Sequence, residues 1–375
     1  MSNFEPTRYG LSSSFRLSSY GKLKESGCKV PESVVTQLFD STARSGRAAL
    51  VAANTGRQQE THLEELLRRL YINTRPPGAG VHHHLTIECR YPIIDDPYAM
   101  GMIICAEAVG DFYAMGITEC EDMMLLICLP TRMTASEINV VVPLMEKGFN
   151  ECFHGTTGPP MNWSRYTYSN CFMAGGMASA YWSKRHQLER GNAVDGDVLV
   201  LTKPLGTQVV IDAFGCIGQP ERWGRYKQLV SENDVRAAYQ QAVKSMCHPN
   251  RRASRLMHLH QAHGAIAVSG KGLLAHAKAL ALVQKQPVSF VIHTLPVFDK
   301  SAAICGRNSR LRRGLSAETS GGLLICMPRV EAVFFCKFLV AEDGHPAWII
   351  GTVQSGNREV TINKNVGIIE VPDIP

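Results

Sequence analysis

The most apolar stretch of the chain runs from Pro97 to Met115 and reads PYAMGMIICAEAVGDFYAM. It is apolar on nearly all sides, which is typical of a buried helix. Its acidic exceptions, Glu107 and Asp111, stand four residues apart and would share one face of that helix. Two neighbouring carboxylates on a buried helix need a cation, a proton or water. The pattern therefore predicts a buried helix that carries a charged site.

Short apolar runs of strand length punctuate the second half of the chain, at residues 197–203, 288–295, 322–327 and 347–353. They are rich in β-branched residues, as strands are. Helical stretches such as residues 272–284 lie between them. This alternation predicts a mixed α and β (α+β) fold, and the polar segment at residues 192–197 suggests a domain boundary.

The first 60 residues are rich in Ser, Arg and Gly and have weak periodicity, so we expect a loosely held arm that includes KESGCKV at residues 24–30. The leucines that follow are spaced for an amphipathic helix at residues 61–72, which begins with a capping-box pattern. We expect three parts: the arm at 1–60, an N-terminal domain at 61–192 and a C-terminal α/β domain at 193–375.

Composition narrows the possible functions. A chain of 375 residues with 45% hydrophobic residues can bury a core in two domains. The net charge of +6 is modest, and no long basic run is interleaved with aromatic residues, so we expect small anionic ligands rather than nucleic acid. No apolar stretch is long enough to span a bilayer, so we expect a cytoplasmic protein that does not bind membranes.

Cysteine and histidine patterns give no metal site. The twelve cysteines include no CxxC pair, so we expect mostly buried, reduced thiols. The HxHxxH pattern of His258, His260 and His263 and the triple histidine at 82–84 do not converge by periodicity alone. We therefore predict no zinc site from either run.

Eight runs, taken together, resemble the selenophosphate synthetase (selenide, water dikinase) family in its eukaryotic form. The runs are SFRL (14–17), GCKVP (27–31), YPIIDDPYAMG (91–101), DFYAMGITEC (111–120), GDVLVLTKPLGTQV (196–209), VSFVIHTLPV (288–297), ETSGGLLIC (318–326) and HPAWIIG (345–351). The resemblance implies a two-domain fold like that of aminoimidazole ribonucleotide synthetases, with N-terminal domains that pair into a homodimer. It also implies that ATP, selenide and water give selenophosphate, AMP and phosphate.

The resemblance assigns the catalytic arm to Ser26, Cys28 and Lys29. Ser26 stands where the family has its reactive Cys or selenocysteine, and a hydroxyl cannot replace a thiolate as a soft nucleophile near neutral pH. Lys29 would contact phosphate, or it is a solvated loop lysine. Cys28 is either a secondary thiol or a structural cysteine.

The resemblance also implies aspartates that hold Mg²⁺ against the ATP phosphates. Of the three metal positions, Asp111 is retained, Asn73 has lost the charge, and Ala267 has no ligand atom. The aspartate before the YP run becomes Glu88, and an asparagine of the family becomes Glu107. We expect magnesium binding to be weak or lost.

The glycine-rich loop that approaches ATP in the family is here at best TGPPM around Gly158. Proline has no N–H to offer a phosphate. The nucleotide contacts implied by the resemblance would therefore involve Lys29, Asn73, Glu88, Asp111 and Gly158.

Two functional hypotheses remain open at the level of sequence. The chain is a selenophosphate synthetase whose activity is weak or lost, or it is a non-catalytic paralogue that keeps the dimeric scaffold for regulation or partner binding. Lys271 stands at an aromatic position of the family. Its ammonium could pair with Glu88, Glu107 and Asp111 in a metal-free cluster, or Lys271 is a solvated loop residue.

Overall fold

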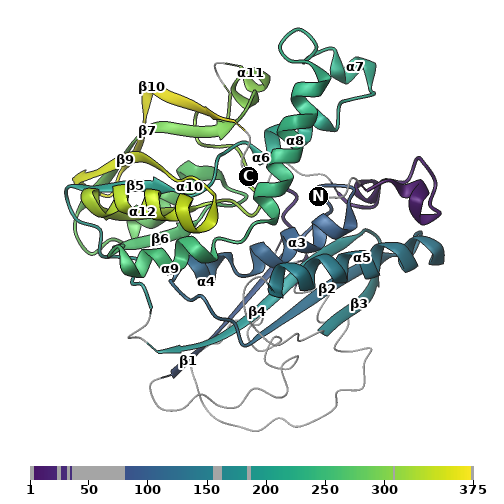
Figure 1. Cartoon of the computed structure of the whole chain (residues 1–375), viewed down its shortest axis with the longest axis horizontal. Coiled ribbons are helices and arrows are strands. Elements are labelled where there is room, and N and C mark those ends of the chain that lie inside the picture. Colours follow the sequence, from purple (N-terminus) through teal and green to yellow (C-terminus); the bar gives the residue numbers. More distant parts are fainter. Residues whose placement is uncertain are drawn as a thin grey trace.

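The computed structural model describes residues 4–22, 27–31, 34–35, 81–154, 163–183, 187–306 and 309–372. In these ranges the chain forms two β-sheets with helices packed against them (Figure 1). The first sheet and its helices comprise β1 (Val81–Arg90), α3 (Pro97–Ala108), α4 (Gly110–Ala114), β2 (Asp122–Pro130), α5 (Ala135–His154), β3 (Trp163–Ser169) and β4 (Met173–Ser183).

The first sheet has the strand order β1-β4-β2-β3, in which only the β2–β3 pair is parallel. Helices α3 and α5 lie side by side on one face of it (Figure 1). Glycines permit this close packing, because a Cβ on Gly101 would lie 2.1 Å from the Met145 carbonyl oxygen. A Cβ on Gly148 would lie 1.9 Å from the Tyr98 carbonyl oxygen. These contacts fix the helix that carries Glu107.

The predicted helix at 97–115 is interrupted. Val109 ends α3 with a ψ of −2°, and α4 begins at the next residue. Because the chain turns there, Glu107 and Asp111 do not share a face: Glu107 is buried and Asp111 is exposed. The prediction of one continuous helix with paired carboxylates was therefore wrong.

The second sheet has the order β10-β7-β9-β5-β8-β6, with only β7 and β10 parallel. Its elements are β5 (Asp197–Leu201), α6 (Thr207–Phe214), α7 (Pro220–Trp223), α8 (Glu232–Cys247), α9 (Arg251–Leu259), β6 (Gly264–Ala267), α10 (Gly272–Leu282), β7 (Val288–Phe298), α11 (Ser301–Cys305), β8 (Leu323–Pro328), α12 (Arg329–Asp343), β9 (Trp348–Ser355) and β10 (Val360–Val371). The strands predicted from the four apolar runs and the helix at 272–284 are confirmed as β5, β7, β8, β9 and α10.

One apolar core joins the two sheets. Strand β5 is buried on both faces, and its residues alternate between two clusters. Val198 and Val200 pack in the cluster that also contains α3 and α5, whereas Leu199 and Leu201 pack against α10 and β7 on the other face. Polar contacts reinforce this junction, since Ser254 Oγ donates to the Tyr113 carbonyl at 2.9 Å. The two sheets thus hold α4 and β6 against each other.

The described N-terminal segments pack closely against the first sheet and its helices. They include the 3₁₀ helices η1 (Pro6–Tyr9) and η2 (Leu17–Tyr20). Leu17 is fully buried, and Ser18 donates two hydrogen bonds to Asp95. Residues 4–22 and 27–31 therefore differ from the loosely held arm expected from composition. The helix predicted at 61–72 lies outside the described residues.

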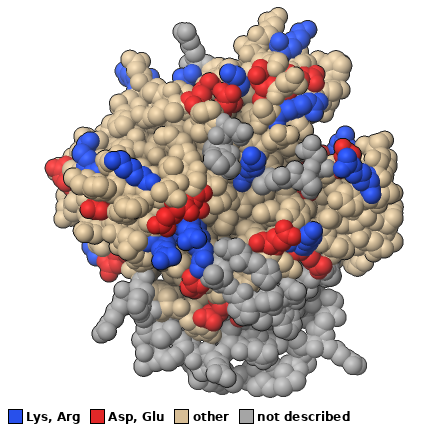
Figure 2. All heavy atoms as spheres, in the orientation of Figure 1, with Lys and Arg blue, Asp and Glu red and all other residues tan. Residues whose placement is uncertain are grey.

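The surface in Figure 2 carries acidic and basic side chains in close alternation over the face that it shows. They do not gather there into a single basic stripe. Among the described helices, none combines the length and apolar character needed to cross a membrane.

Candidate active site

The GCKV segment of the arm forms a short antiparallel bridge with the end of β1. Val30 N–H donates to the Cys89 carbonyl, and Tyr91 N–H donates to the Cys28 carbonyl, both at 2.9 Å. Gly27 and Cys28 have φ values of 65° and 57°, in the left-handed region. This tight turn points Lys29 along the strand that carries Glu88 and Arg90.

Arg90 lies at the centre of the site and is completely buried. Its Nε and Nη2 donate to the two carboxylate oxygens of Glu107, and its Nη1 donates to the Gly27 carbonyl. Burial alone would lower the pKa of Arg90, but the Glu107 carboxylate more than offsets it and raises that pKa. The guanidinium therefore fastens the arm and α3 to β1 as a permanent cation.

Gly27 is wedged against this guanidinium. A Cβ at this position would lie 3.0 Å from Arg90 Nη1 and 3.2 Å from Thr319 Oγ1. The arm is thereby enclosed between the first sheet and the loop that begins at Glu318.

Lys29 pairs with Glu88. Its Nζ donates to Glu88 Oε1 at 2.7 Å and lies 2.7 Å from Oε2. Burial and the charge of Glu107 raise the pKa of Glu88, while Lys29 and Arg90 oppose this rise. The lysine that the resemblance assigns to phosphate is therefore held by a carboxylate of the same site, so it is not an isolated loop lysine.

Helix α4, which carries Asp111, packs against β6, which carries Ala267. A Cβ on Gly110 would lie 3.8 Å from Ala267 Cβ. Nearby, burial lowers the pKa of His276, while the charge of Asp111 opposes this and those of Lys29 and Lys271 add to it. These three charged groups therefore lie within electrostatic range of one imidazole, and the elements that carry two of the three predicted metal positions are in contact.

Of the two alternatives for Lys271, the ion-pair cluster is wrong and the solvated lysine agrees with the structure. Lys271 is exposed at the start of α10 and has no carboxylate within ion-pairing distance among the described residues. The cations that contact Glu107 and Glu88 are Arg90 and Lys29 instead. The turn at Val109 and the position of Lys271 at a helix end keep these groups apart.

Three predicted site residues, Ser26, Asn73 and Gly158, lie outside the described residues. Cys28 is 3% exposed, and burial of this kind suits a structural thiol better than a reactive one.

The donors in the described ranges do not fit a two-magnesium site. Arg90 occupies both oxygens of Glu107, Lys29 occupies Glu88, and Ala267 offers no ligand atom. Asp111 is the exposed carboxylate that remains of this group. One carboxylate does not neutralise the phosphates of a nucleotide through two bridging metal ions.

Two buried ionisable residues beside the arm were not singled out from the sequence. Lys203 Nζ donates to the carbonyls of Ser245 and Ser320 at 2.9 and 2.7 Å, and burial lowers its pKa to about 7. Glu318 accepts from Gly206 N, Thr207 N and Thr207 Oγ1, and burial raises its pKa to about 7. Both belong to runs that carry the resemblance, TKPLGT and ETSGG, which was the available signal.

The HxHxxH histidines each face a different partner. His258 contacts the Gly116 carbonyl, His260 contacts Glu331, and His263 contacts Asp197. Of the triple run at 82–84, the side chain of His84 is described, and its ring lies tilted against that of Trp182 with centroids 5.0 Å apart.

Comparison with known proteins adds three findings. Residues 194–363 match the family model "AIR synthase related protein, C-terminal domain". The chain is 40% identical over 394 residues to selenide, water dikinase 2 of Mus musculus, covering 98% of this chain and 86% of that one. It is 34% identical to selenide, water dikinase of Dictyostelium discoideum, covering 96% and 94% of the two chains.

Solved structures of the same fold have low sequence identity. Thiamine-monophosphate kinase from Stenotrophomonas maltophilia matches with a TM-score of 0.59 and 17% identity, covering 77% of this chain and 88% of that one. Hydrogenase maturation protein HypE, solved in complex with ATP, matches with a TM-score of 0.56 and 12% identity over 96% and 99% of the two chains. The two-sheet architecture is therefore that of aminoimidazole ribonucleotide synthetase-like proteins.

Proposed function

Because this chain belongs to the selenide, water dikinase family, we propose that it keeps the ATP-binding scaffold and the reaction class of that family with activity that is weak or lost. The reaction is the ATP-dependent phosphorylation of selenide to selenophosphate, with AMP and phosphate as the other products. ATP and selenide are the proposed small-molecule partners.

Similarity of fold supports the ATP part of this proposal. A HypE structure of the same fold contains ATP, and a thiamine monophosphate kinase structure contains the ATP analogue AMPPCP. In this chain, Lys29 and the segment around Asp111 and Ala267 are the described groups that would face the nucleotide.

The pairing of Glu107 with Arg90 is the observation that carries the proposed loss of activity. Phosphoryl transfer depends on positioning and on neutralising the charge of the phosphates. Here the buried cation is already neutralised by a carboxylate, so it offers little net charge to a phosphate. With Ala267 at a metal position and Ser26 at the nucleophile position, both the charge clamp and the selenide-handling group would be missing.

The first experiment measures ATP consumption and AMP formation by the purified full-length chain, with and without selenide, across a magnesium titration. We expect AMP formation near background and no stimulation by selenide. Robust selenide-dependent AMP formation by the unmodified chain contradicts the proposed loss of activity.

Restoration variants identify the cause. Ser26→Cys alone should not rescue activity, because the metal positions remain altered. Joint Ser26→Cys, Asn73→Asp and Ala267→Asp, combined with Glu107→Asn and Arg90→Met to remove the ion pair, should raise the rate by at least about 100-fold, the loss typical for one stabilising group. Lys29→Met in that background is the matched control and should abolish the gain.

A second candidate is a non-catalytic homodimeric scaffold for regulation or partner binding. It is favoured by the docked arm, since Arg90 holds Gly27 through groups of the chain itself. Thermal unfolding with ATP separates the two, because a ligand that binds the folded state raises the melting temperature. No shift with ATP, with or without Mg²⁺, favours the scaffold.

The division at residue 193 also remains a proposal. It is supported by the family model, which begins at residue 194, and by the change of sheet between β4 and β5.

A further inference from the structure

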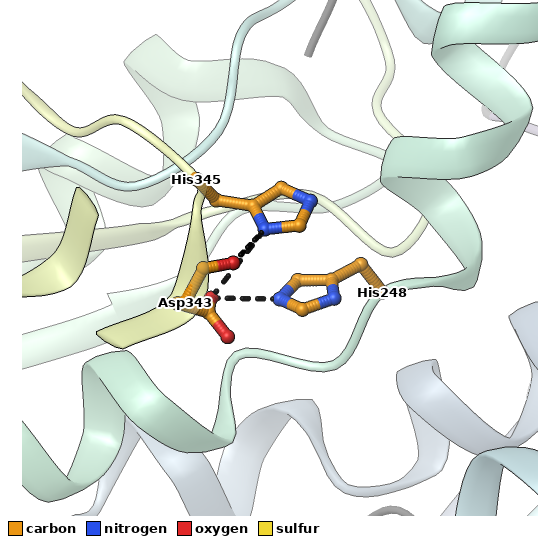
Figure 3. A group of neighbouring side chains, drawn as sticks. All are labelled: His248, Asp343 and His345. Atoms are coloured by element: carbon orange, nitrogen blue, oxygen red, sulfur yellow. Dashed lines mark hydrogen bonds and ion pairs between the residues drawn. The ribbon is translucent and has the colours of Figure 1, made fainter. Parts of the chain in front are cut away.

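Outside the candidate active site, His248, Asp343 and His345 form a compact group (Figure 3). His248 Nε2 lies 2.8 Å from Asp343 Oδ2, and His345 Nδ1 lies 3.7 Å from the same oxygen. One ligand atom from each residue lies within 4.8 Å of the other two. Ligand atoms around a tetrahedral zinc ion are about 3.4 Å apart, given bonds of about 2.0–2.1 Å. The two observed distances to Asp343 Oδ2, 2.8 Å from His248 and 3.7 Å from His345, lie below and above that value.

The three residues come from segments that a cation would favour. His248 caps the C-terminus of α8, and Asp343 is the last residue of α12. His345 follows in the loop before β9. The C-termini of two helices of 16 and 15 residues therefore meet at this group, and each carries partial negative charge on its last carbonyls.

The group is accessible to an ion from solvent. The exposed fractions of the side chains are 27% for His248, 13% for Asp343 and 20% for His345. The two imidazoles stack with centroids 3.8 Å apart, and His345 Nδ1 is 2.7 Å from the Asp343 backbone oxygen. To bind a metal, the His345 ring must turn so that an unprotonated nitrogen faces the ion. The metal would then replace the proton shared by His248 and Asp343.

The nearest buried cation, Lys203, contacts the last carbonyls of α8 and not the three side chains. Lys203 Nζ is 2.5 Å from the His248 backbone oxygen and also donates to Ser245 and Ser320. Its hydrogen bonds go to carbonyls, so it makes none to the imidazole nitrogens or to the Asp343 carboxylate. It also links this group to the Ser320 loop beside the arm.

We propose that His248, Asp343 and His345 bind one zinc ion, with water as the fourth ligand. Two imidazoles and one carboxylate are the donors of a three-ligand zinc site, whereas Mg²⁺ takes oxygen donors and would not be retained. The site is separate from the candidate active site, and its proposal does not depend on ATP or selenide turnover.

The test is zinc binding to the full-length chain after chelator treatment, measured by equilibrium dialysis with Zn²⁺ alone. His248→Ala, His345→Ala and Asp343→Asn should each bind one zinc equivalent fewer than the unmodified chain. The zinc affinity of this site should fall by more than about tenfold, because even the loss of a residue that only supports a metal ligand costs about that much. His260→Ala is the matched control, because His260 pairs with Glu331 at the same 2.8 Å without a third described ligand. It should lose none. Zinc that binds elsewhere on the chain, including at residues 82–84, is the same in every variant and therefore does not affect the comparison with the unmodified chain.

Cobalt absorption tests the site without any variant. Co²⁺ bound by the unmodified chain should show the visible bands of tetrahedral coordination, and one equivalent of Zn²⁺ should remove them. The absence of such bands overturns the proposal. So does an unchanged zinc stoichiometry in the three variants, or an equal loss in the His260 control.

Discussion

Arg90 and Glu107 are the residues that most distinguish this site, because they place a complete ion pair in the protein interior. Arg90 is 0% exposed and Glu107 is 8% exposed. Desolvating two such charges is costly, and only good geometry with further hydrogen bonds offsets the cost. The bidentate contact and the bond to the Gly27 carbonyl supply both. The pair therefore acts as a fastener for the arm rather than as a receptor for phosphate.

Removing one partner should reveal this role. Glu107→Gln keeps the size of the side chain but leaves the Arg90 charge unpaired, so we expect a loss of about 3 to 5 kcal/mol in the free energy of unfolding, measured by urea titration. The double variant Arg90→Met, Glu107→Leu should recover most of it. Glu232→Gln, in the exposed pair with Arg236, is the control and should cost about 0.5 kcal/mol or less. Equal losses in the two Gln variants would refute the role of the pair.

At the scale of elements, the hydrophobic pattern predicted the helices and strands whose formation depends on local sequence. Strands β5, β7, β8 and β9 and helix α10 were predicted from local apolar patterns. Strands β5 and β8 are buried almost throughout, which gives them an apolar run of strand length. The break at Val109 was missed, although Gly110 follows it directly, because the apolar pattern continues through both helices. The Arg90–Glu107 contact joins a strand to a helix, so no sequence period could reveal it. The cluster proposed around Lys271 failed because it, too, depended on contacts between elements that are far apart in the sequence.

Helix α6 gives a pH-dependent prediction. Glu318 accepts from the backbone N–H groups of Gly206 and Thr207 at the N-terminus of α6, yet burial raises its pKa from 4.5 to about 7. The folded chain therefore binds this proton more tightly than the unfolded chain. Between about pH 4.5 and 7, ionisation favours unfolding, so this group lowers stability as the pH rises, by up to about 1.4 kcal/mol per pH unit.

Glu318→Gln tests this slope. Urea unfolding from pH 5 to 8 should show that the unmodified chain loses stability relative to Glu318→Gln as the pH rises, because Gln does not ionise. The exposed Glu221→Gln is the control for replacing a glutamate away from the core. A constant difference for Glu318→Gln would mean that its pKa is not raised in the folded chain.

At the scale of the whole molecule, the first sheet has two apolar faces. Along β2, Met123, Leu125 and Ile127 join the core beneath α3 and α5, whereas Met124 and Leu126 join a second cluster with Leu85, Ile87 and Met177. Helices α3 and α5 lie on the same side of this sheet (Figure 1). An apolar face must be buried against another layer. Met124, Leu126 and Met177 are already buried in the single chain, whereas Leu85 and Ile87 on the same face remain partly exposed. A second copy of the chain would cover these two residues.

We therefore predict that the chain is a homodimer that pairs through the sheet face carrying Leu85. Light scattering after gel filtration should give twice the mass of one chain at micromolar concentration. Leu85→Glu introduces a charge into this face and should shift the mass toward that of one chain, with the circular dichroism spectrum retained as proof of folding. Tyr168→Glu on β3 is the control, because Tyr168 is 68% exposed, and it should remain dimeric. A single-chain mass for the unmodified protein would exclude the homodimer, and the apolar face would then be covered by other residues of the same chain.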